Sequence, residues 1–313
     1  MRALITGVTG FAGSHLADLL AAETDWDLCG TVYGPPPVGA LPARVQAVPL
    51  DLRDAEATRA LVAGFVPDYV FHLAAQAFVP ESWQDPWGTF ETNVRAEINV
   101  LEAVRALGHG RALVVASNEE YGRTRPEDLP LREDSPLRPD SPYGVSKVAQ
   151  DLLGLSYYLS YGLEVVRVRP FNHIGPRQNE RFVAPAFAKQ VAEIELGRCE
   201  PVLHVGNLAT QRDFGDVRDV VRAYQLLMLK GAPGEVYNIG PGRPRAVREL
   251  LDTMLAAAHV PIEVAVDPAR FRPSDVPVSY CDPSALRVAT GWEPRIPFER
   301  SVRDVLEDWR GRV

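Results

Sequence analysis

Tyr143 and Lys147 are a phenol and an amine four positions apart, which is a spacing that suits proton transfer. They fall in a segment, 141–161, whose pattern predicts a helix, and residues four apart lie on one helix face. A free tyrosine has a pKa of about 10, and lowering it by roughly three units takes about 4 kcal/mol of preference for the phenolate. A lysine ammonium in a dry cleft supplies energy of that order, so we expect Lys147 to lower the pKa of Tyr143. The same spacing also arises by chance on protein surfaces, so the neighbouring motifs must show whether these two residues are catalytic.

Ser117 and Glu119 are the next candidates, because they follow a short apolar run at 112–116 that predicts a buried strand. In an open parallel sheet, ligands bind beyond the carboxyl ends of the strands. Ser117 and Glu119 are therefore candidate site residues, and Glu119 either takes part in the chemistry or only orients the loop.

Three glycines, Gly7, Gly10 and Gly13, separate a predicted strand at 1–6 from a segment at 14–20 with helical spacing of its apolar residues. Strand, glycine-rich turn and helix form the layout of a dinucleotide-binding unit. The glycines permit a tight turn and a close approach to a pyrophosphate, and the helix start offers N–H groups to the phosphates. A glycine-rich turn without a ligand is the alternative, and the flanking strand and helix argue against it.

The elements that position these motifs alternate through the first half of the chain. Strands are predicted at 26–32, 44–50, 68–75 and 112–116, and a long helix at 89–107. The pattern predicts an α/β fold, a Rossmann-type doubly wound parallel sheet. We interpret His72 as a core residue, and Asn93 and Asn99 as packing or backbone-bonding residues of the helix.

The ends of two predicted strands bear on the choice of nucleotide. The second strand ends in Tyr33, Gly34 and Pro35, with neither an acid for a ribose hydroxyl nor an arginine for a 2′-phosphate. NAD(H) and NADP(H) therefore both remain open. Asp51 and Leu52 close the third strand, where Asp51 either meets an adenine or caps the helix that follows.

After residue 174 the strict alternation ends, and shorter strands and helices follow. We expect residues 1–174 to form the dinucleotide-binding domain and residues 175–313 to form mainly a smaller mixed α/β substrate-binding lobe. Residues of about 212–240 are expected to return to the first domain.

Composition excludes several classes of function. The chain has 313 residues and a net charge of −8, without the basic patch of a nucleic-acid-binding surface. Cys29, Cys199 and Cys281 are too few and too scattered for a metal site or a disulfide framework, which favours a reducing cytoplasm. We expect no signal peptide, no membrane span and no metal.

Further motifs run the length of the chain. They are TGVTGFAG, FHLAAQ, YGVSK, RPFNHIGPRQ, RDFGDVRD, VYNIG and TGWEPRIP. With them the chain resembles an extended short-chain dehydrogenase/reductase acting on nucleotide sugars. FNHIGP followed by FVAPAFAKQ, VGNL, RDF and RPSDVP is most similar to the branch that reduces GDP-4-keto-6-deoxy-D-mannose to GDP-D-rhamnose.

The resemblance implies a role for each matching position. Ser117, Glu119, Tyr143 and Lys147 would be catalytic, with Tyr143 passing a proton while hydride moves between a nicotinamide and the sugar. The residues implied to contact NADP(H) or NAD(H) are Gly7, Gly10, Phe11, Ala12, Gly13, Asp51, Leu52, Leu73, Ala74, Ala75, Gln76, Tyr143 and Lys147. Those implied to bind the GDP-sugar are Asn172, Val183, Lys189, Arg212 and Arg272.

Two questions stay open within the resemblance. Glu119 stands two residues after Ser117, as in GDP-mannose 4,6-dehydratases, so a dehydratase is the alternative to the reductase, followed by a nucleotide-sugar 4-epimerase. Intact Ser117, Tyr143 and Lys147 argue against an inactive nucleotide-binding regulator. Members of the family commonly dimerise through two helices, and Leu152, Leu155, Tyr157 and Tyr158 would suit such a homodimer or burial within one chain.

Overall fold

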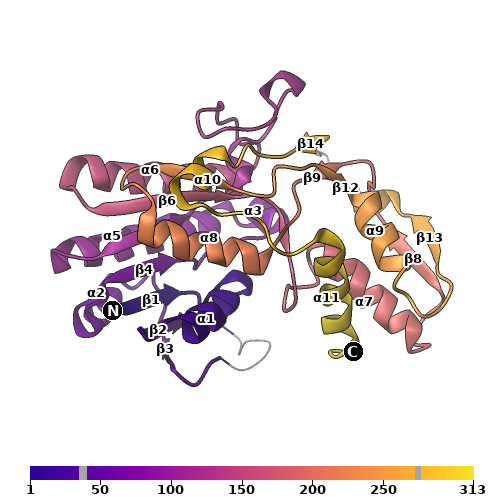
Figure 1. Ribbon diagram of the computed structural model, residues 1–313, viewed down its shortest axis with the longest axis horizontal. Helices are drawn as coiled ribbons and strands as arrows, with labels where there is room; N and C mark the ends of the chain where they lie inside the picture. The colour runs from indigo at the N-terminus through magenta and orange to yellow at the C-terminus, as the bar shows by residue number, and fades with distance from the viewer. Residues whose placement is uncertain (35–40, 272–275) are drawn as a thin grey trace.

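A seven-stranded parallel sheet forms the centre of the computed structural model, which describes residues 1–34, 41–271 and 276–313 (Figure 1). Its strands are β1 (Arg2–Thr6), β2 (Asp27–Val32), β3 (Val45–Pro49), β4 (Tyr69–His72), β5 (Arg111–Val115), β6 (Glu164–Pro170) and β11 (Val236–Ile239). They are ordered β3-β2-β1-β4-β5-β6-β11, and every pair is parallel. The predicted Rossmann-type sheet is confirmed, and the order reverses between β1 and β4, where ligands bind in such sheets.

Helices cover both faces of the sheet. One face packs against α1 (Phe11–Glu23), α8 (Val217–Lys230) and α10 (Ser284–Thr290), and the other against α2 (Ala55–Phe65), α5 (Ala96–Leu107) and α6 (Pro142–Tyr161). Successive strand residues point to opposite faces of the sheet. Phe71 and Leu113 therefore pack against the helices on the first face, whereas Val70 and Val114 pack against those on the other face. Strand β11 thus belongs to the sheet itself, and helix α8 belongs to the layer of helices on its first face.

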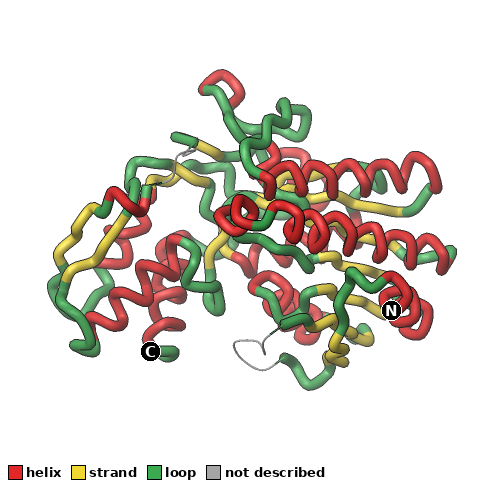
Figure 2. Tube along the Cα trace, turned by 180° about the vertical axis from the view of Figure 1, so that it is seen from behind, coloured by secondary structure: helices red, strands yellow, loops and turns green. Residues whose placement is uncertain are grey.

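A second core lies away from the sheet. It is built by α7 (Val183–Glu195), α9 (Val247–Leu255) and α11 (Phe298–Arg310), which pack with the strand pair β8 (Val202–Val205) and β13 (Glu263–Val266). Figure 1 shows this group at the opposite end of the molecule from α2 and α5, and the reverse view in Figure 2 shows the same separation. Small strand pairings join the two parts, namely β7 (His173–Ile174) with β10 (Gly215–Asp216), and β9 (Gln211–Arg212) with β12 (Arg245–Ala246) and β14 (Val278–Ser279).

The helix expected at 89–107 is divided in the structure. It consists of α4 (Pro86–Phe90), a π-helical turn η1 (Glu91–Arg95) and α5, and it follows α3 (Val79–Gln84). Within the turn, Asn93 accepts from Gln76 N at 2.8 Å and donates to Gln76 O at 3.1 Å, while Asn99 donates to Leu52 O at 2.8 Å. Both asparagines therefore bond backbone, as predicted, and the side chain of Asn93 fixes the chain beyond β4.

Three single-turn 3₁₀ helices complete the elements of the described ranges: η2 (Asn118–Glu120), η3 (Pro126–Asp128) and η4 (Pro268–Arg270). Among the described residues no helix combines the length and the apolar character that a membrane crossing needs. The same residues contain no group of three or more His, Cys, Asp or Glu side chains placed to hold a metal ion.

Candidate active site

The glycine loop between β1 and α1 is shaped by contacts that leave no room for side chains. Gly7 has a φ of +67°, and a Cβ there would lie 2.9 Å from Ala74 Cα in the loop after β4. Gly10 is the N-cap of α1 and donates to Gly7 O at 2.9 Å. The loop thus places the first N–H groups of α1 at the carboxyl edge of the sheet, which is a binding site for phosphate.

Gly13 has a different task from the first two glycines. A Cβ on Gly13 would lie 2.2 Å from the carbonyl oxygen of Gly7, well inside van der Waals contact. The third glycine therefore lets the first turn of α1 pack directly on the β1 loop.

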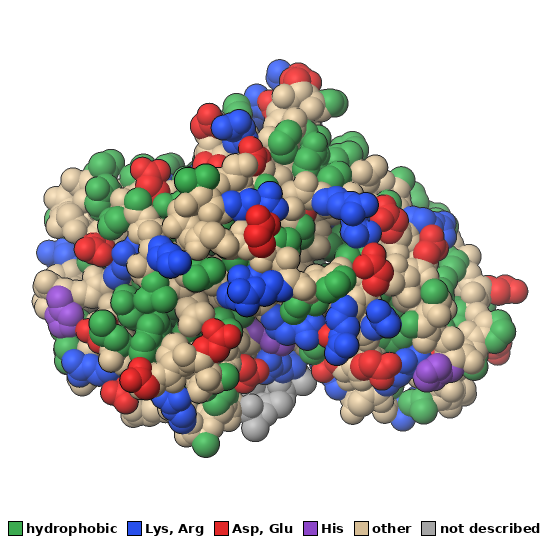
Figure 3. All heavy atoms as spheres, in the orientation of Figure 1, with side chains coloured by type: hydrophobic (Ala, Val, Ile, Leu, Met, Phe, Trp, Pro, Cys, Tyr) green, Lys and Arg blue, Asp and Glu red, His purple; other side chains and the backbone are tan. Residues whose placement is uncertain are grey.

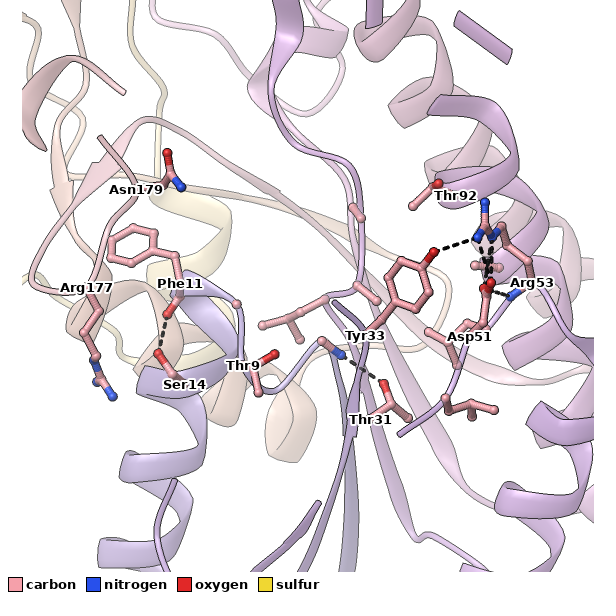
Figure 4. Close-up of a pocket in the computed structure, with 18 of the residues that line it drawn as sticks. Thr9, Phe11, Ser14, Thr31, Tyr33, Asp51, Arg53, Thr92, Arg177 and Asn179 are labelled. Atoms are coloured by element: carbon pink, nitrogen blue, oxygen red, sulfur yellow. Dashed lines mark hydrogen bonds and ion pairs between the residues drawn. The ribbon is translucent and has the colours of Figure 1, made fainter. Parts of the chain in front are cut away.

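A pocket of about 400 Å³ opens above this loop (Figure 4). It is lined by Gly7, Thr9, Gly10, Phe11, Ser14, Thr31, Tyr33, Leu50, Asp51, Leu52, Arg53, Leu73, Ala74, Ala75, Thr92, Ala96, Arg177, Asn179 and Arg312. Eight of the residues expected to contact a dinucleotide are thereby gathered in one pocket, since Gly7, Gly10, Phe11, Asp51, Leu52, Leu73, Ala74 and Ala75 all line it. Ala12, Gly13, Gln76, Tyr143 and Lys147 are not among its lining residues.

One end of the pocket is formed by the ends of β2 and β3. Arg53 donates to both carboxylate oxygens of Asp51 and, through Nη2, to the Tyr33 hydroxyl at 2.9 Å (Figure 4). The hydrogen bond from Arg53 lowers the pKa of Asp51. The helix-capping alternative for Asp51 is wrong, because the side chain of Asp54 caps α2. Arg53 was not predicted from the sequence, because it belongs to no periodic pattern and no motif.

Basic groups also lie at the other side of the pocket. Arg177 donates to Asp18 at 2.6 Å and contacts His15 Nδ1 at 2.8 Å, while His15 Nε2 bonds Pro176 O at 2.9 Å. Burial lowers the pKa of His15 to about 4, so the ring is neutral near pH 7. Figure 3 shows basic side chains gathered around the middle of that face of the molecule, where the two parts meet. Three arginines thus line the pocket, Arg53, Arg177 and Arg312, and each is paired with a carboxylate.

Tyr143 and Lys147 lie in the first turns of α6, which begins after Ser141. Ser141 caps the helix by accepting from Gly144 N at 3.0 Å. The two functional side chains are buried, and the Lys147 ammonium lies 5.8 Å from the centre of the Tyr143 ring. Lys147 Nζ donates to Val115 O at 2.8 Å, which ties it to the end of β5.

Ser117 reaches Tyr143 from the loop after β5. It caps η2 by accepting from Glu119 N at 3.2 Å, while its own N–H donates to Glu120 Oε1 at 3.1 Å. The Ser117 side chain lies close enough to Tyr143 to favour the ionised form of its phenol. The structure thus brings three of the four expected catalytic residues into one buried cluster, and Glu119 lies near enough to raise the pKa of Tyr143.

The predicted lowering of the Tyr143 pKa is wrong. Burial raises the pKa of this phenol, Glu119 and Glu120 add to the rise, and the nearby Ser117 side chain opposes it. The free energy needed to ionise a buried phenol exceeds the stabilisation that nearby dipoles and charges give to the phenolate. Tyr143 is consequently neutral at pH 7, which is the form that donates a proton rather than the form that removes one.

Behind the Ser117 loop lies a buried set of charged groups that we call the Arg169 network, consisting of Glu120, Asp151, Arg167 and Arg169. Arg169 Nε lies 3.1 Å from Glu120 Oε2 and donates at 2.8 Å to Asp151 Oδ2. Arg167 donates to the other Asp151 oxygen at 2.6 Å. All four side chains are buried, so the network fixes the loop, β6 and α6 relative to one another.

The comparisons with known proteins agree with this geometry. A family model described as "GDP-mannose 4,6 dehydratase" matches residues 4–305. The chain belongs to this family. The resemblance to extended short-chain dehydrogenases/reductases of nucleotide sugars is thereby confirmed.

Relatives of this dehydratase-family protein include both a reductase and dehydratases. It is 38% identical over 314 residues to "GDP-6-deoxy-D-mannose reductase" of Pseudomonas aeruginosa, covering 100% of the chain and 98% of that protein. It is 30% identical to "GDP-mannose 4,6 dehydratase 1" of Arabidopsis thaliana, covering 98% of the chain and 89% of that protein. The identity to the reductase is thus the higher of the two.

Two solved structures superpose on the whole chain. One is RMD of Pseudomonas aeruginosa complexed with NADPH, with a TM-score of 0.88, 34% identity and 100% coverage of both chains. The other is UDP-glucose 4-epimerase of Thermus thermophilus in complex with NAD, with a TM-score of 0.89, 33% identity and the same coverage.

The residues of this family member fit a nicotinamide dinucleotide. Gly7 and Gly10 leave space that a Cβ would fill, and α1 begins at the pocket with free N–H groups for a pyrophosphate. The pocket continues past Ala74 and Ala75, in the loop that Asn93 holds. NAD(P) is accordingly the cofactor of this protein, as expected.

The residues expected to bind the sugar nucleotide are spread over the junction with the second core. Asn172 follows β6, and its Oδ1 is buried and accepts no hydrogen bond from the described residues. Val183 is 36% exposed at the start of α7, and Lys189 on the same helix pairs with Glu180. Arg212 donates to Val276 O at 2.7 Å. Arg272 lies outside the described residues.

Proposed function

We propose that this protein uses NADPH or NADH to reduce the 4-keto group of GDP-4-keto-6-deoxy-D-mannose, forming GDP-D-rhamnose. The observation that carries the proposal is the burial of Ser117, Tyr143 and Lys147 at the end of β5, with Lys147 bonded to Val115 O. Strand β5 pairs with β4, and the loop after β4 lines the dinucleotide pocket. The 38% identity to a GDP-6-deoxy-D-mannose reductase supports the choice of substrate.

When bound, the nicotinamide cofactor supplies the hydride that adds to the sugar carbonyl carbon. Tyr143 donates its hydroxyl proton to the carbonyl oxygen, and Ser117 hydrogen-bonds the same oxygen as negative charge develops there. Lys147, fixed by Val115 O, stabilises the phenolate that Tyr143 becomes. Burial excludes water, and solvent restores the proton of Tyr143 after the product leaves.

Asn172 and Arg212 are our proposed substrate contacts among the described residues. The unpartnered Asn172 Oδ1 supports a donor from the substrate, and the planar guanidinium of Arg212 suits a diphosphate oxygen pair. Val183 and Lys189 extend this surface along α7.

The activity test compares two substrates. With the 4-keto-6-deoxy sugar nucleotide and NADPH, we expect stoichiometric loss of absorbance at the nicotinamide band and one product with a new hydroxyl group. With GDP-mannose and catalytic NADP⁺, we expect no 4-keto sugar. Formation of a keto sugar from GDP-mannose alone would establish the dehydratase, for which Glu119 beside Ser117 is the favouring observation.

Arg53, at one end of the pocket, favours NADPH over NADH as the cofactor. In dinucleotide folds an arginine near the end of the second strand accommodates the 2′-phosphate that distinguishes NADPH from NADH. Tyr33 directly follows β2, and Arg53 donates to its hydroxyl at 2.9 Å. Arg53→Ala should therefore raise the NADPH dissociation constant by about tenfold or more, because a hydrogen bond to a charged group contributes about 1.5–3 kcal/mol.

Fluorescence titration with NADPH and NADH checks this expectation, and NADH affinity should change little. Arg59→Ala is the matched control, since Arg59 is an exposed arginine on the following helix α2. Equal weakening of both cofactors by Arg53→Ala would show that the residue only shapes the loop.

We further propose the expected division into a dinucleotide-binding domain and a mainly substrate-binding lobe, which the separate second core supports. A homodimer through α5 and α6 is supported by the exposure of Leu152 and Leu159, at 50% and 70%. Free Cys29, Cys199 and Cys281 support a reducing cytoplasm.

A further inference from the structure

Four side chains form a contact between two distant segments of the chain, and we call this group the Phe78 clasp. It consists of Phe78 and Glu81 in the first segment, and of Arg181 and Phe182 in the second. The guanidinium carbon of Arg181 lies 3.9 Å from the centre of the Phe78 ring, and Arg181 Nη2 donates to Glu81 Oε2 at 2.7 Å. The Phe182 ring meets the Phe78 ring edge to face, with 5.9 Å between the ring centres. Arg181 and Phe182 thus contact the same aromatic ring.

The first segment continues the loop that follows β4. Ala74 and Ala75 line the dinucleotide pocket, and Phe78 comes shortly after them as the N-cap of α3. Gln76 Nε2 donates to Phe78 O at 2.8 Å, which holds the loop and the start of α3 together. Helix α3 in turn packs against α6, the helix that carries Tyr143. The Phe78 side of the clasp is therefore fixed to the pocket loop and to the catalytic helix.

The second segment joins β7 to α7. Asn179 in this segment lines the same pocket and is one of the side chains drawn in Figure 4. Its Oδ1 accepts from Arg181 N at 2.9 Å, and its carbonyl oxygen accepts from Phe182 N at 3.2 Å. These two hydrogen bonds fix Asn179 relative to the clasp, and Phe182 is the N-cap of α7. Separation of Arg181 from Phe78 therefore displaces a residue of the pocket wall.

The strength of the clasp comes from the combination of its contacts. The side chains of Arg181 and Glu81 are 47% and 43% exposed, and an ion pair with that exposure contributes little by itself. A guanidinium over an aromatic face and an edge-to-face pair of rings each add to it. The sum holds the two walls of the pocket together and still allows them to separate when the ligand leaves.

We propose that Arg181 is a positioning residue that holds the Asn179 wall against the loop after β4 and so slows the release of NADPH. Arg181 is not among the lining residues of the pocket, so it acts through Phe78 and Asn179 rather than by touching the dinucleotide. A ligand between the two walls favours the closed contact, and the closed contact in turn retains the ligand. The inference concerns the cofactor and does not depend on which sugar the protein reduces.

The release rate can be measured by stopped-flow displacement, in which excess NADP⁺ replaces bound NADPH and its fluorescence changes. Arg181→Ala should release NADPH about fivefold faster, because it removes both the ion pair and the cation–π contact. The association rate should change by less than about twofold. Glu81→Gln should speed release by only about twofold, since Arg181 still stacks on Phe78. The double variant should release NADPH no faster than Arg181→Ala alone, because the effects of contacting residues are not additive.

Arg105→Ala is the matched control. Arg105 pairs with Glu102 at 2.6 Å, and its guanidinium carbon lies 5.0 Å from the centre of the Tyr161 ring, so it combines the same two kinds of contact outside the pocket. This variant should release NADPH at the wild-type rate. Thermal unfolding gives a second measurement. Without NADPH, Arg181→Ala should melt at the wild-type temperature, whereas the rise in melting temperature that NADPH causes should be smaller.

Release of NADPH at the wild-type rate from Arg181→Ala overturns the inference. Additive effects in the double variant also overturn it, because Glu81 and Arg181 would then act separately. An equal fall in melting temperature with and without NADPH would leave Arg181 a structural residue. Failure of the wild-type protein to reduce the keto sugar, with the faster release from Arg181→Ala still present, instead overturns the proposed function.

Discussion

Replacing Tyr143 by Phe should lower kcat for reduction by about 10³-fold, since general acid catalysis contributes about 10²–10⁴-fold. The change removes one hydroxyl from a buried ring and leaves the ring's packing in place. NADPH affinity should change little, because Tyr143 does not line the dinucleotide pocket. Steady-state rates with the keto sugar and a separate NADPH titration measure the two effects.

Tyr161→Phe is the control for this substitution. Tyr161 is the last residue of the same helix and is 60% exposed, so it undergoes the same chemical change far from the cluster. A Tyr143→Phe protein with full turnover would mean that another group donates the proton, and the proposed mechanism would then fail.

Gly13→Ala should disable the cofactor site without touching the catalytic cluster. The added Cβ would lie 2.2 Å from Gly7 O, so α1 must move away from the β1 loop. Displacing one N–H from a phosphate costs about 2 kcal/mol, which corresponds to a roughly 30-fold rise in the NADPH dissociation constant. The melting temperature should fall as well, because the helix loses contact with the sheet.

Gly64→Ala provides the comparison, since Gly64 lies inside α2 and its added Cβ would meet no described atom within 4 Å. A helical glycine replaced by alanine in open space should stabilise the protein by up to about 1 kcal/mol. NADPH titration and thermal unfolding of both variants separate the effects. Unaltered NADPH affinity in Gly13→Ala would contradict the placement of the pyrophosphate at this loop.

The parallel sheet could be predicted because its central strands are apolar runs that precede glycines or polar clusters. β6 was not predicted, although it is a central strand. Arg167 and Arg169 interrupt its apolar pattern, and the acid that pairs with them, Asp151, lies on α6. The amphipathic helix α11 was also not predicted. Its apolar face packs in the second core, which is built from four other elements far apart in the chain.

The candidate site shows the same limit. Tyr143 and Lys147 could be placed together because helix spacing is a local signal, whereas only the family resemblance joined Ser117 to them. The environment of Tyr143 could not be predicted, since the burial that raises its pKa comes from elements far apart in the chain. Arg53 was missed for a related reason, because its role depends on Tyr33, which the fold brings beside it.

The Arg169 network restricts how the active-site loop can be re-engineered for another sugar. Glu120 holds the loop from below, through the backbone of Ser117 and through Arg169. Removing either partner of such a pair leaves the other ion buried and unpaired, which lowers the free energy of unfolding by about 3–5 kcal/mol. Substitution of Glu120 should therefore destabilise the loop and the elements packed around it. Libraries aimed at new substrates should therefore keep Glu120 and diversify Asn118, which lies in the same turn, η2.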